Sequence, residues 1–225
     1  MEHRSDGAQI MNIQELLTRC PVVPLVQAED PAVAVKTSRA LAAGGLQVAE
    51  VVFRTDRALE CLQAVADEVP EVLAGAGTVL TAEQANAALD NGARFIVSPG
   101  LDDGVVGVAR ERGVPVYPGI MTPSELQHAY NLGLDTVKYF PASIAGGIPG
   151  LKALSSVFRS MKFMPTGGVS AKNLAEFLAV PAVLACGGSW LTPGKAIEAG
   201  DYDAVTRLAA EAVAIARSAR GQNVG

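Results

Sequence analysis

The sequence predicts an α/β fold, a (β/α)8 TIM barrel with a short N-terminal covering helix. Short apolar runs rich in β-branched residues alternate eight times with longer helical segments. The runs are apolar throughout rather than at every second position, which is typical of parallel strands covered on both faces. The chain has 225 residues, and barrels of this kind span roughly 200–250 residues as one domain. Eight β-α units in one chain therefore favour a closed barrel.

The predicted strands are apolar runs bounded by turn or capping residues. They cover Val22–Val26, Val48–Phe53, Val72–Gly75, Phe95–Ser98, Val114–Tyr117, Thr136–Phe140, Lys162–Pro165 and Val183–Cys186. Capping residues mark the helices between them. The N-cap candidates are Asp30, Asp56, Thr81, Asp102, Thr122 and Ser170, and the glycines that fit positions just past a helix end are Gly92, Gly113 and Gly133. A further short helix at Ile13–Arg19 is expected to cover the N-terminal end of the barrel.

The alternation of strands and helices continues along the chain without a sign of a domain boundary. No linker, low-complexity segment or charge run divides the chain. Residues 10–225 are therefore interpreted as one barrel domain, and residues 1–9 as a disordered tail. The alternative fold is an open, doubly wound parallel sheet. The first strand is not followed by the G-x-G-x-x-G turn of a dinucleotide-binding sheet, which argues against that alternative.

The composition argues against several classes of partner. The formal net charge is −5 and only 18% of residues are charged, without a basic cluster; this disfavours nucleic acid and anionic membrane surfaces. No stretch reaches the roughly 18 apolar residues needed to span a bilayer. The three cysteines are far apart and odd in number, and only two histidines occur. These features indicate a cytoplasmic protein without a metal site.

Lys138 stands among apolar and aromatic residues of the predicted strand Thr136–Phe140. A lysine in a buried strand loses hydration, which favours the neutral amine. A neutral amine can attack a ketone and form a Schiff base. The alternative is a lysine at a frayed strand end whose amine reaches water.

Glu50 is an acid inside the apolar run Val48–Phe53, and it shares one strand face with Arg54. A carboxylate that points into a barrel must form a pair, become protonated or act as a base. One interpretation is a structural ion pair with Arg54 or Lys138. The other is a general acid/base that moves protons beside Lys138.

Arg54 ends the same strand, and its guanidinium matches a carboxylate with two parallel hydrogen bonds. Thr78, after the glycines of Gly75-Ala76-Gly77, is a second candidate for that carboxylate. The alternatives are an exposed loop arginine and a threonine that caps the next helix. The turn Ser98-Pro99-Gly100 follows the next strand, where Pro99 is a candidate wall of the pocket or a loop residue only.

Two glycine pairs follow the last two predicted strands. Barrels frequently bind phosphate between the loops after strands 7 and 8, through backbone N–H groups. Gly167, Gly168, Gly188 and Ser189 occupy those loops. Tight turns are the alternative explanation for either pair.

These motifs resemble the 2-keto-3-deoxy-6-phosphogluconate (KDPG) aldolase and 4-hydroxy-2-oxoglutarate (KHG) aldolase family. The resemblance runs from Pro21 to about Ala216. It is carried by Pro-Val-Val-Pro at 21–24, Ala-Gly-Gly at 43–45, Glu50-Val-x-x-Arg54-Thr55, Gly75-Ala-Gly-Thr-Val-Leu80, Ser98-Pro-Gly-Leu101, Lys138-Tyr-Phe-Pro141, Pro165-Thr-Gly-Gly168, Gly187-Gly-Ser-Trp-Leu191 and Glu198-Ala-Gly-Asp-Tyr-Asp203. Two positions depart from the family's usual run: Tyr139, where phenylalanine is common, and Ser143, where glutamate is common. Strand periodicity predicts that Tyr139 points away from Lys138.

The resemblance implies a role for each candidate residue. Lys138 matches the Schiff-base lysine and Glu50 the proton-transferring carboxylate. The others match positions that hold the pyruvate carboxylate (Arg54, Thr78), form the pocket wall (Pro99, Phe140, Thr166) and bind phosphate (Gly167, Gly168, Gly188, Ser189). The resemblance further implies a cytoplasmic homotrimer that uses no metal or other cofactor and has a phosphorylated keto-acid substrate.

The predicted function is reversible cleavage of KDPG to pyruvate and glyceraldehyde 3-phosphate, with cleavage of 4-hydroxy-2-oxoglutarate as a second activity. One alternative is an aldolase that prefers the galactonate-derived substrate, which differs at C4. Another is a phosphosugar isomerase or epimerase, which needs acid/base residues but no covalent lysine. A non-catalytic phosphosugar-binding protein and a metal-dependent aldolase are further alternatives. The sequence leaves open the preference at C4 and any side activity on oxaloacetate.

Overall fold

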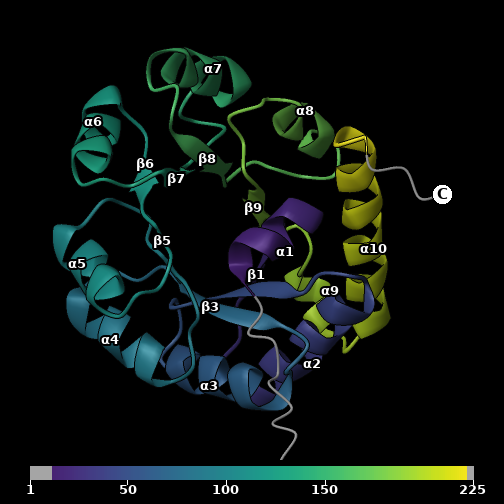
Figure 1. The fold of residues 1–225 in the computed structure, drawn as a ribbon. Coiled ribbons are helices and arrows are strands. Elements are labelled where there is room, and N and C mark those ends of the chain that lie inside the picture. The colour runs from purple at the N-terminus through teal and green to yellow at the C-terminus, as the bar shows by residue number, and fades with distance from the viewer. Residues whose placement is uncertain (1–11, 222–225) are drawn as a thin grey trace, which may run out of the picture.

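Residues 12–221, which the computed structural model describes, form parallel strands with helices packed around them (Figure 1). One sheet has six strands in the order β5-β4-β3-β2-β1-β9, and a second has three in the order β6-β7-β8. All strand pairs are parallel. The predicted parallel α/β architecture is therefore confirmed. The tail predicted at residues 1–9 lies outside the described residues.

The strands and helices alternate along the chain. The strands are β1 (Val22–Val26), β2 (Val48–Val52), β3 (Leu73–Gly77), β4 (Ile96–Val97), β5 (Val116–Tyr117), β6 (Gly119–Ile120), β7 (Thr136–Tyr139), β8 (Lys162–Pro165) and β9 (Cys186–Gly188). The helices are α1 (Ile13–Arg19), α2 (Pro31–Ala43), α3 (Ala58–Glu68), α4 (Ala82–Asp90), α5 (Asp103–Glu111), α6 (Pro123–Asn131), α7 (Gly147–Val157), α8 (Leu174–Leu178), α9 (Gly194–Glu198) and α10 (Tyr202–Ala219).

The two sheets meet at two places. Pro118 alone separates β5 from β6, and its carbonyl accepts a hydrogen bond of 2.8 Å from the Lys138 N–H. At the other side, parallel bridges join Phe163 to Val183 and Thr166 to Gly187. The second bridge links the end of β8 to β9, which in turn pairs with β1.

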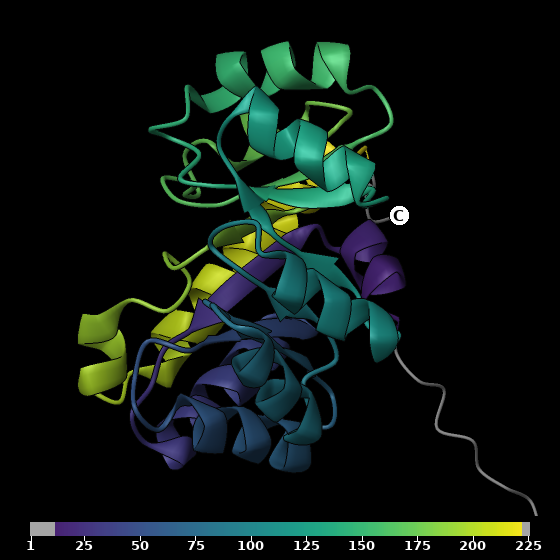
Figure 2. The ribbon, with the colours of Figure 1, turned by 90° about the vertical axis from the view of Figure 1, so that its left-hand side faces the viewer.

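Helix α1 covers one end of the strands. Its side chains Ile13, Leu16 and Leu17 are buried in an inner cluster. The strands and the residues just before them contribute the rest of this cluster: Val23, Val48, Leu73, Phe95, Val97, Tyr117, Met164 and Ala185. The side chain of Asn12 caps the helix by accepting a hydrogen bond from the Gln14 N–H. In the side view of Figure 2, α1 (purple, right) lies at one end of the strands and α9 (yellow-green, left) at the other. The predicted helix at Ile13–Arg19 is confirmed.

A larger core lies between the strands and the surrounding helices. It includes Val51, Ile120, Val137 and Tyr139 from the strands, together with the buried faces of the helices. Tyr139 therefore points toward the helical layer while its neighbour Lys138 points inward, as predicted. The last helix, α10, packs against α2 and α8, so an early and a late helix of the described chain lie side by side (Figure 1).

Six of the eight predicted strands have different bounds in the structure, the short strand β6 was not predicted, and two strands end further along the chain than predicted. The run predicted at Val183–Cys186 becomes β9 at Cys186–Gly188, and β3 ends at Gly77 rather than Gly75. Backbone pairing extends through glycines in both strands because ladder hydrogen bonds need no side chain. Gly187 and Gly188 therefore belong to a strand, not to the loop in which the prediction placed them.

Most of the predicted caps are confirmed. Asp30, Thr81, Asp102 and Thr122 each accept a hydrogen bond from the first turn of their helix. Two predicted caps are wrong, because α3 begins after Arg57 and α8 begins after Asn173. Asp56 and Ser170 lie before these positions, one and three residues too early. Among the described residues, no helix has both the length and the apolar character needed to cross a membrane.

Candidate active site

Lys138 and Glu50 form a buried pair. Lys138 Nζ lies 3.4 Å from Glu50 Oε1, and each residue is only 1% exposed. Lys138 is in register with Gly119 on β6 and with Met164 on β8, whose side chain belongs to the inner cluster. The lysine is therefore not at a frayed strand end. Of the two ion pairs predicted for Glu50, the structure forms the one with Lys138.

The second carboxylate oxygen of Glu50 is available for chemistry. Among the described residues, Glu50 Oε2 has no hydrogen-bond partner although it is buried. A buried carboxylate oxygen without a partner is costly unless another group binds to it. A carboxylate placed in this way beside an amine can exchange protons with a bound substrate.

Glycine in β3 makes space for this carboxylate. A Cβ atom on Gly77 would lie 2.1 Å from Glu50 Oε1, and one on Gly75 would lie 2.3 Å from the Phe95 ring. From the sequence, these glycines are noted only as the residues that precede Thr78. The structure shows that their bare backbone leaves room for Glu50 and Phe95, so sequence reasoning missed the supporting role of Gly77.

Arg54 and Thr78 contact each other. Arg54 Nε donates a hydrogen bond of 3.1 Å to Thr78 Oγ1. Thr78 has φ of 58°, a left-handed conformation that is uncommon outside glycine and costs of order 1–3 kcal/mol. Thr78 does not cap the following helix, because Thr81 does. Arg54 is exposed, and within the described residues its guanidinium forms no ion pair.

A cavity of about 640 Å³ brings Arg54 and Ser189 together. It opens at the carboxyl ends of β1, β2 and β9, and its walls include Leu25, Val52 and Thr192. Leu25 is in register with Glu50, so the cavity wall adjoins the buried pair although neither Lys138 nor Glu50 lines it. Arg54, which is predicted to bind a carboxylate, and Ser189, which is predicted to bind a phosphate, thus line the same cavity.

The two predicted phosphate loops lie side by side. The bridge between Thr166 and Gly187 places the residues that follow them, Gly167 and Gly188, next to each other. Gly167 and Gly168 have φ of 87° and 88°, which glycine adopts without strain. Within the described residues, the Gly168 N–H donates to no protein group. A backbone N–H without a protein acceptor is the kind of donor that anions bind.

Gly188 has a packing role in addition. A Cβ atom on Gly188 would lie 1.9 Å from the Trp190 ring, so the absence of a side chain lets the indole pack on the backbone. Gly187 similarly leaves room for the Thr166 side chain, 2.4 Å from its ideal Cβ position. Both glycines are thus explained in part by packing, which the sequence could not separate from phosphate binding.

The three predicted wall residues lie on segments that follow or adjoin the lysine strand β7. The Phe140 ring centroid lies 5.2 Å from Lys138 Nζ. Thr166 is buried on the neighbouring chain segment, and its hydroxyl donates to the Met164 carbonyl at 3.4 Å. The Pro99 carbonyl packs against Gly119, the register partner of Lys138. Sequence reasoning missed Gly119, since its close neighbour Pro99 is 20 residues away in the chain.

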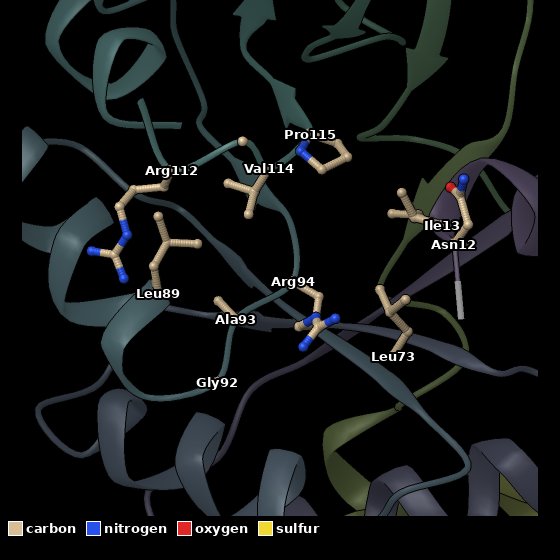
Figure 3. A pocket seen from close by; sticks show the side chains of 11 residues that line it. Asn12, Ile13, Leu73, Leu89, Gly92, Ala93, Arg94, Arg112, Val114 and Pro115 are labelled. Carbon is tan, nitrogen blue, oxygen red and sulfur yellow. The ribbon is translucent and has the colours of Figure 1, made fainter. Parts of the chain in front are cut away.

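A second cavity, of about 650 Å³, lies away from these residues (Figure 3). It is lined by the first residues of α1 and β3 and by the segments before β4 and β5, including Arg94 and Arg112. These are the amino ends of the strands. Arg112 is already bound to Asp90 at 2.8 Å. None of the residues predicted for catalysis or binding lines this cavity.

The three thiols of the chain have raised pKa values. Burial raises the pKa of all three thiols, that of Cys20 to about 11, and those of Cys61 and Cys186 also lie above the usual value. A thiol with a raised pKa is a poor nucleophile. Among residues 12–221, no group of three histidine, cysteine or acidic side chains is arranged to hold a metal ion.

The chain is similar to known aldolases over most of its length. The KHG/KDPG aldolase of Escherichia coli strain K12 is 45% identical over 200 residues, 89% of this chain and 94% of that protein. The 2-dehydro-3-deoxy-phosphogluconate aldolase of Treponema pallidum is 45% identical over 206 residues, 92% of this chain and 98% of that protein. The crystal structure of Legionella pneumophila KDPG aldolase holds pyruvate as a covalent carbinolamine. It matches with a TM-score of 0.85 and 38% identity, over 89% of this chain and 97% of that one.

The sequence model of one protein family matches nearly the whole described chain. That family is described as "KDPG and KHG aldolase", and the match covers residues 13–208. The buried lysine, its carboxylate partner and the two predicted phosphate loops all lie inside that range. The chain belongs to the KDPG and KHG aldolase family.

Proposed function

We propose that the protein is a class I aldolase that reversibly cleaves KDPG to pyruvate and glyceraldehyde 3-phosphate, the aldol step of the Entner–Doudoroff pathway. The observation that carries the proposal is the contact of 3.4 Å between Lys138 Nζ and Glu50 Oε1, both buried. Its support is the family to which the chain belongs. The relatives from E. coli and T. pallidum carry the names of this activity.

Lys138 is the nucleophile of the proposed mechanism. After its ammonium passes a proton to Glu50, the amine adds to the C2 ketone to give a carbinolamine. Glu50 then returns that proton to the departing hydroxyl, so that water leaves and an iminium ion remains. Glu50 accepts the proton of the C4 hydroxyl, directly or through one water. The C3–C4 bond then breaks, and its electrons move into the iminium to form an enamine while the aldehyde leaves. Protonation of the enamine at C3 and hydrolysis release pyruvate and the free lysine.

The remaining residues hold the two charged ends of the substrate. Arg54 and Thr78 bind the carboxylate next to C2, since the guanidinium offers paired donors and Thr78 lies 3.1 Å away. Gly167, Gly168, Gly188 and Ser189 bind the phosphate. Binding energy from the phosphate, far from the breaking bond, orients the substrate at Lys138. Pro99, Phe140 and Thr166 form the wall around the reacting carbons.

A second substrate is 4-hydroxy-2-oxoglutarate, cleaved to pyruvate and glyoxylate. It presents the same keto acid to Lys138 and Arg54 but carries no phosphate. The E. coli relative, at 45% identity, is named for both activities. Kinetics of variants with both substrates therefore distinguish residues that bind the keto acid from residues that bind the phosphate.

The proposal includes a closed (β/α)8 TIM barrel formed by residues 10–225 as one domain. The contacts at Pro118 and the bridges from Phe163 and Thr166 support closure between the two sheets. The strands also follow chain order from β1 to β5, without the change of direction that a doubly wound sheet requires.

The proposal further includes a cytoplasmic homotrimer. Met121, Ile144 and Val157 are 42%, 73% and 72% exposed and lie around α6 and α7, beside a groove of about 730 Å³ that Met121 and Val157 line. Exposed apolar patches of this kind mark contacts between subunits. Light scattering during size exclusion tests the trimer, and a monomer would contradict it.

The three unpaired cysteines suit a reducing compartment.

Product analysis tests the activity. Incubation with KDPG should release pyruvate and glyceraldehyde 3-phosphate in equal amounts, and chelators should not change the rate. An isomerase or epimerase would release neither product, and a binding protein would leave the substrate intact. Comparison with the galactonate-derived epimer decides the preference at C4.

A further inference from the structure

The loop that follows the lysine strand is joined to the first glycine loop of the proposed phosphate site. The Ala142 N–H donates to the Thr166 carbonyl at 2.8 Å, and the Ser143 N–H donates to the Gly167 carbonyl at 3.0 Å. The loop after β7 therefore continues the pairing of β7 with β8 beyond the ends of both strands.

The side chain of Ser143 lies directly on Gly168. A Cβ atom on Gly168 would lie 2.5 Å from Ser143 Cβ and 2.6 Å from Ser143 Oγ. The serine hydroxyl is thus beside the backbone whose N–H has no protein acceptor among the described residues. Ser143 is exposed, and its hydroxyl takes part in none of the hydrogen bonds formed within residues 12–221.

The loop that carries Ser143 is held in place from its other end. The Tyr139 hydroxyl donates to the Ala145 carbonyl. The Ala145 N–H donates to the Pro141 carbonyl at 2.9 Å, and the Gly147 N–H donates to the Ala142 carbonyl at 2.8 Å. A donor on a loop fixed in this way loses little conformational entropy when a ligand binds.

We propose that the Ser143 hydroxyl donates a hydrogen bond to the phosphate of the substrate, so that the loop after β7 forms a third wall of the phosphate site. This inference rests on the proposed function. A phosphate monoester presents three acceptor oxygens. The loops after β8 and β9 supply backbone donors on two sides, and Ser143 supplies a hydroxyl next to Gly168. The hydroxyl gives selectivity for phosphorylated substrates and touches none of the reacting carbons.

Steady-state kinetics with two substrates test the role of Ser143. In Ser143→Ala, kcat/KM for KDPG should fall about tenfold, mostly through KM, because one hydrogen bond to a charged group is lost. The value for 4-hydroxy-2-oxoglutarate should not change. Ser143→Thr, which keeps the hydroxyl, should recover most of the loss. Ser156→Ala is the control, since Ser156 is also exposed but bonds to Ala153 within α7.

Equal losses on both substrates, or no loss on either, would overturn the assignment. Binding of inorganic phosphate, measured by ³¹P NMR titration, gives a second test that does not depend on turnover. Phosphate should bind the wild-type protein and the Ser156→Ala variant equally and Ser143→Ala several-fold more weakly. If the wild-type protein turned over neither substrate but this difference remained, the proposed function would fail and the Ser143 site would stand. Equal binding of phosphate by all three proteins would refute the Ser143 site.

Discussion

The Glu50 side chain occupies the space that a side chain at Gly77 would need. A Cβ atom on Gly77 would lie 2.1 Å from Glu50 Oε1 and 2.5 Å from Glu50 Cγ. The two residues lie on neighbouring strands, where Val52 is in register with Gly77 and Glu50 with Gly75. The carboxylate therefore extends along β3 toward its carboxyl end. The bare backbone of β3 thus helps to set the distance of 3.4 Å between Glu50 and Lys138.

Gly77→Ala should displace the Glu50 carboxylate and lower kcat by about a hundredfold, the effect of roughly 1 Å of misplacement. The matched control is Gly107→Ala, because a Cβ on Gly107 in α5 meets nothing within 4 Å. That control should keep full activity and gain slight helix stability. Steady-state kinetics on both purified variants check the prediction, and a fully active Gly77→Ala enzyme would refute the steric argument.

Glu50→Gln should preserve the shape of the site while removing proton transfer. The expected loss in kcat is about a hundred- to ten-thousand-fold, since that is the range of general acid/base catalysis. KM should change much less, because the groups that bind the substrate are untouched. An unchanged kcat would mean that Glu50 is only the structural partner of Lys138.

Arg54→Gln should weaken both substrates to a similar extent, because both present the same carboxylate beside C2. The expected rise in KM is about ten- to a hundredfold, the loss of a hydrogen-bonded charged contact. Arg57→Gln is the control, since Arg57 is also exposed and bonds to Glu60 on the surface at 2.6 Å. If only KDPG were affected, Arg54 would belong to the phosphate site instead.

Ser189→Ala should weaken the phosphorylated substrate and leave the unphosphorylated one unaffected. Ser189 lines the same cavity as Arg54 and is a proposed phosphate ligand, so kcat/KM for KDPG should fall by about tenfold while that for 4-hydroxy-2-oxoglutarate stays constant. Equal losses on both substrates would contradict a phosphate role. Kinetics of Arg54 and Ser189 variants side by side therefore map the two ends of the substrate.

The native protein should resist thiol reagents at neutral pH. The thiolate is the reactive form, and burial raises the pKa of Cys20 to about 11 and raises the pKa of Cys61 and of Cys186 as well. A raised pKa lowers the thiolate fraction, so alkylation should be slow until the pH approaches these values. Intact mass after iodoacetamide should show little labelling and full activity, whereas the unfolded chain should take up three labels. Rapid loss of activity in the native state would contradict this account.

The chemistry of the site was readable from sequence where a charged residue interrupts an apolar strand. Lys138 and Glu50 stand out in this way, because a buried charge needs a partner. The contact between Gly77 and Glu50 was not readable, since it joins residues on different strands through the absence of a side chain. Ser143 was noticed only as a departure from the family, and its contact with Gly168 depends on how two loops meet. The position of β9 at Cys186–Gly188 could not be predicted either, because backbone pairing with β1 sets the bounds of this strand and the side-chain pattern does not.

The most direct test of the mechanism is the intact mass after incubation with pyruvate and sodium borohydride, followed by peptide mapping. The account predicts one reduced pyruvate adduct per chain, on Lys138, and no adduct in Lys138→Ala. Lys162, whose amine is exposed and donates to the Pro181 carbonyl at 3.2 Å, gives the control variant Lys162→Ala, which should be labelled normally. An adduct that persists in Lys138→Ala, or no adduct on the folded wild-type protein, would contradict the Schiff-base mechanism.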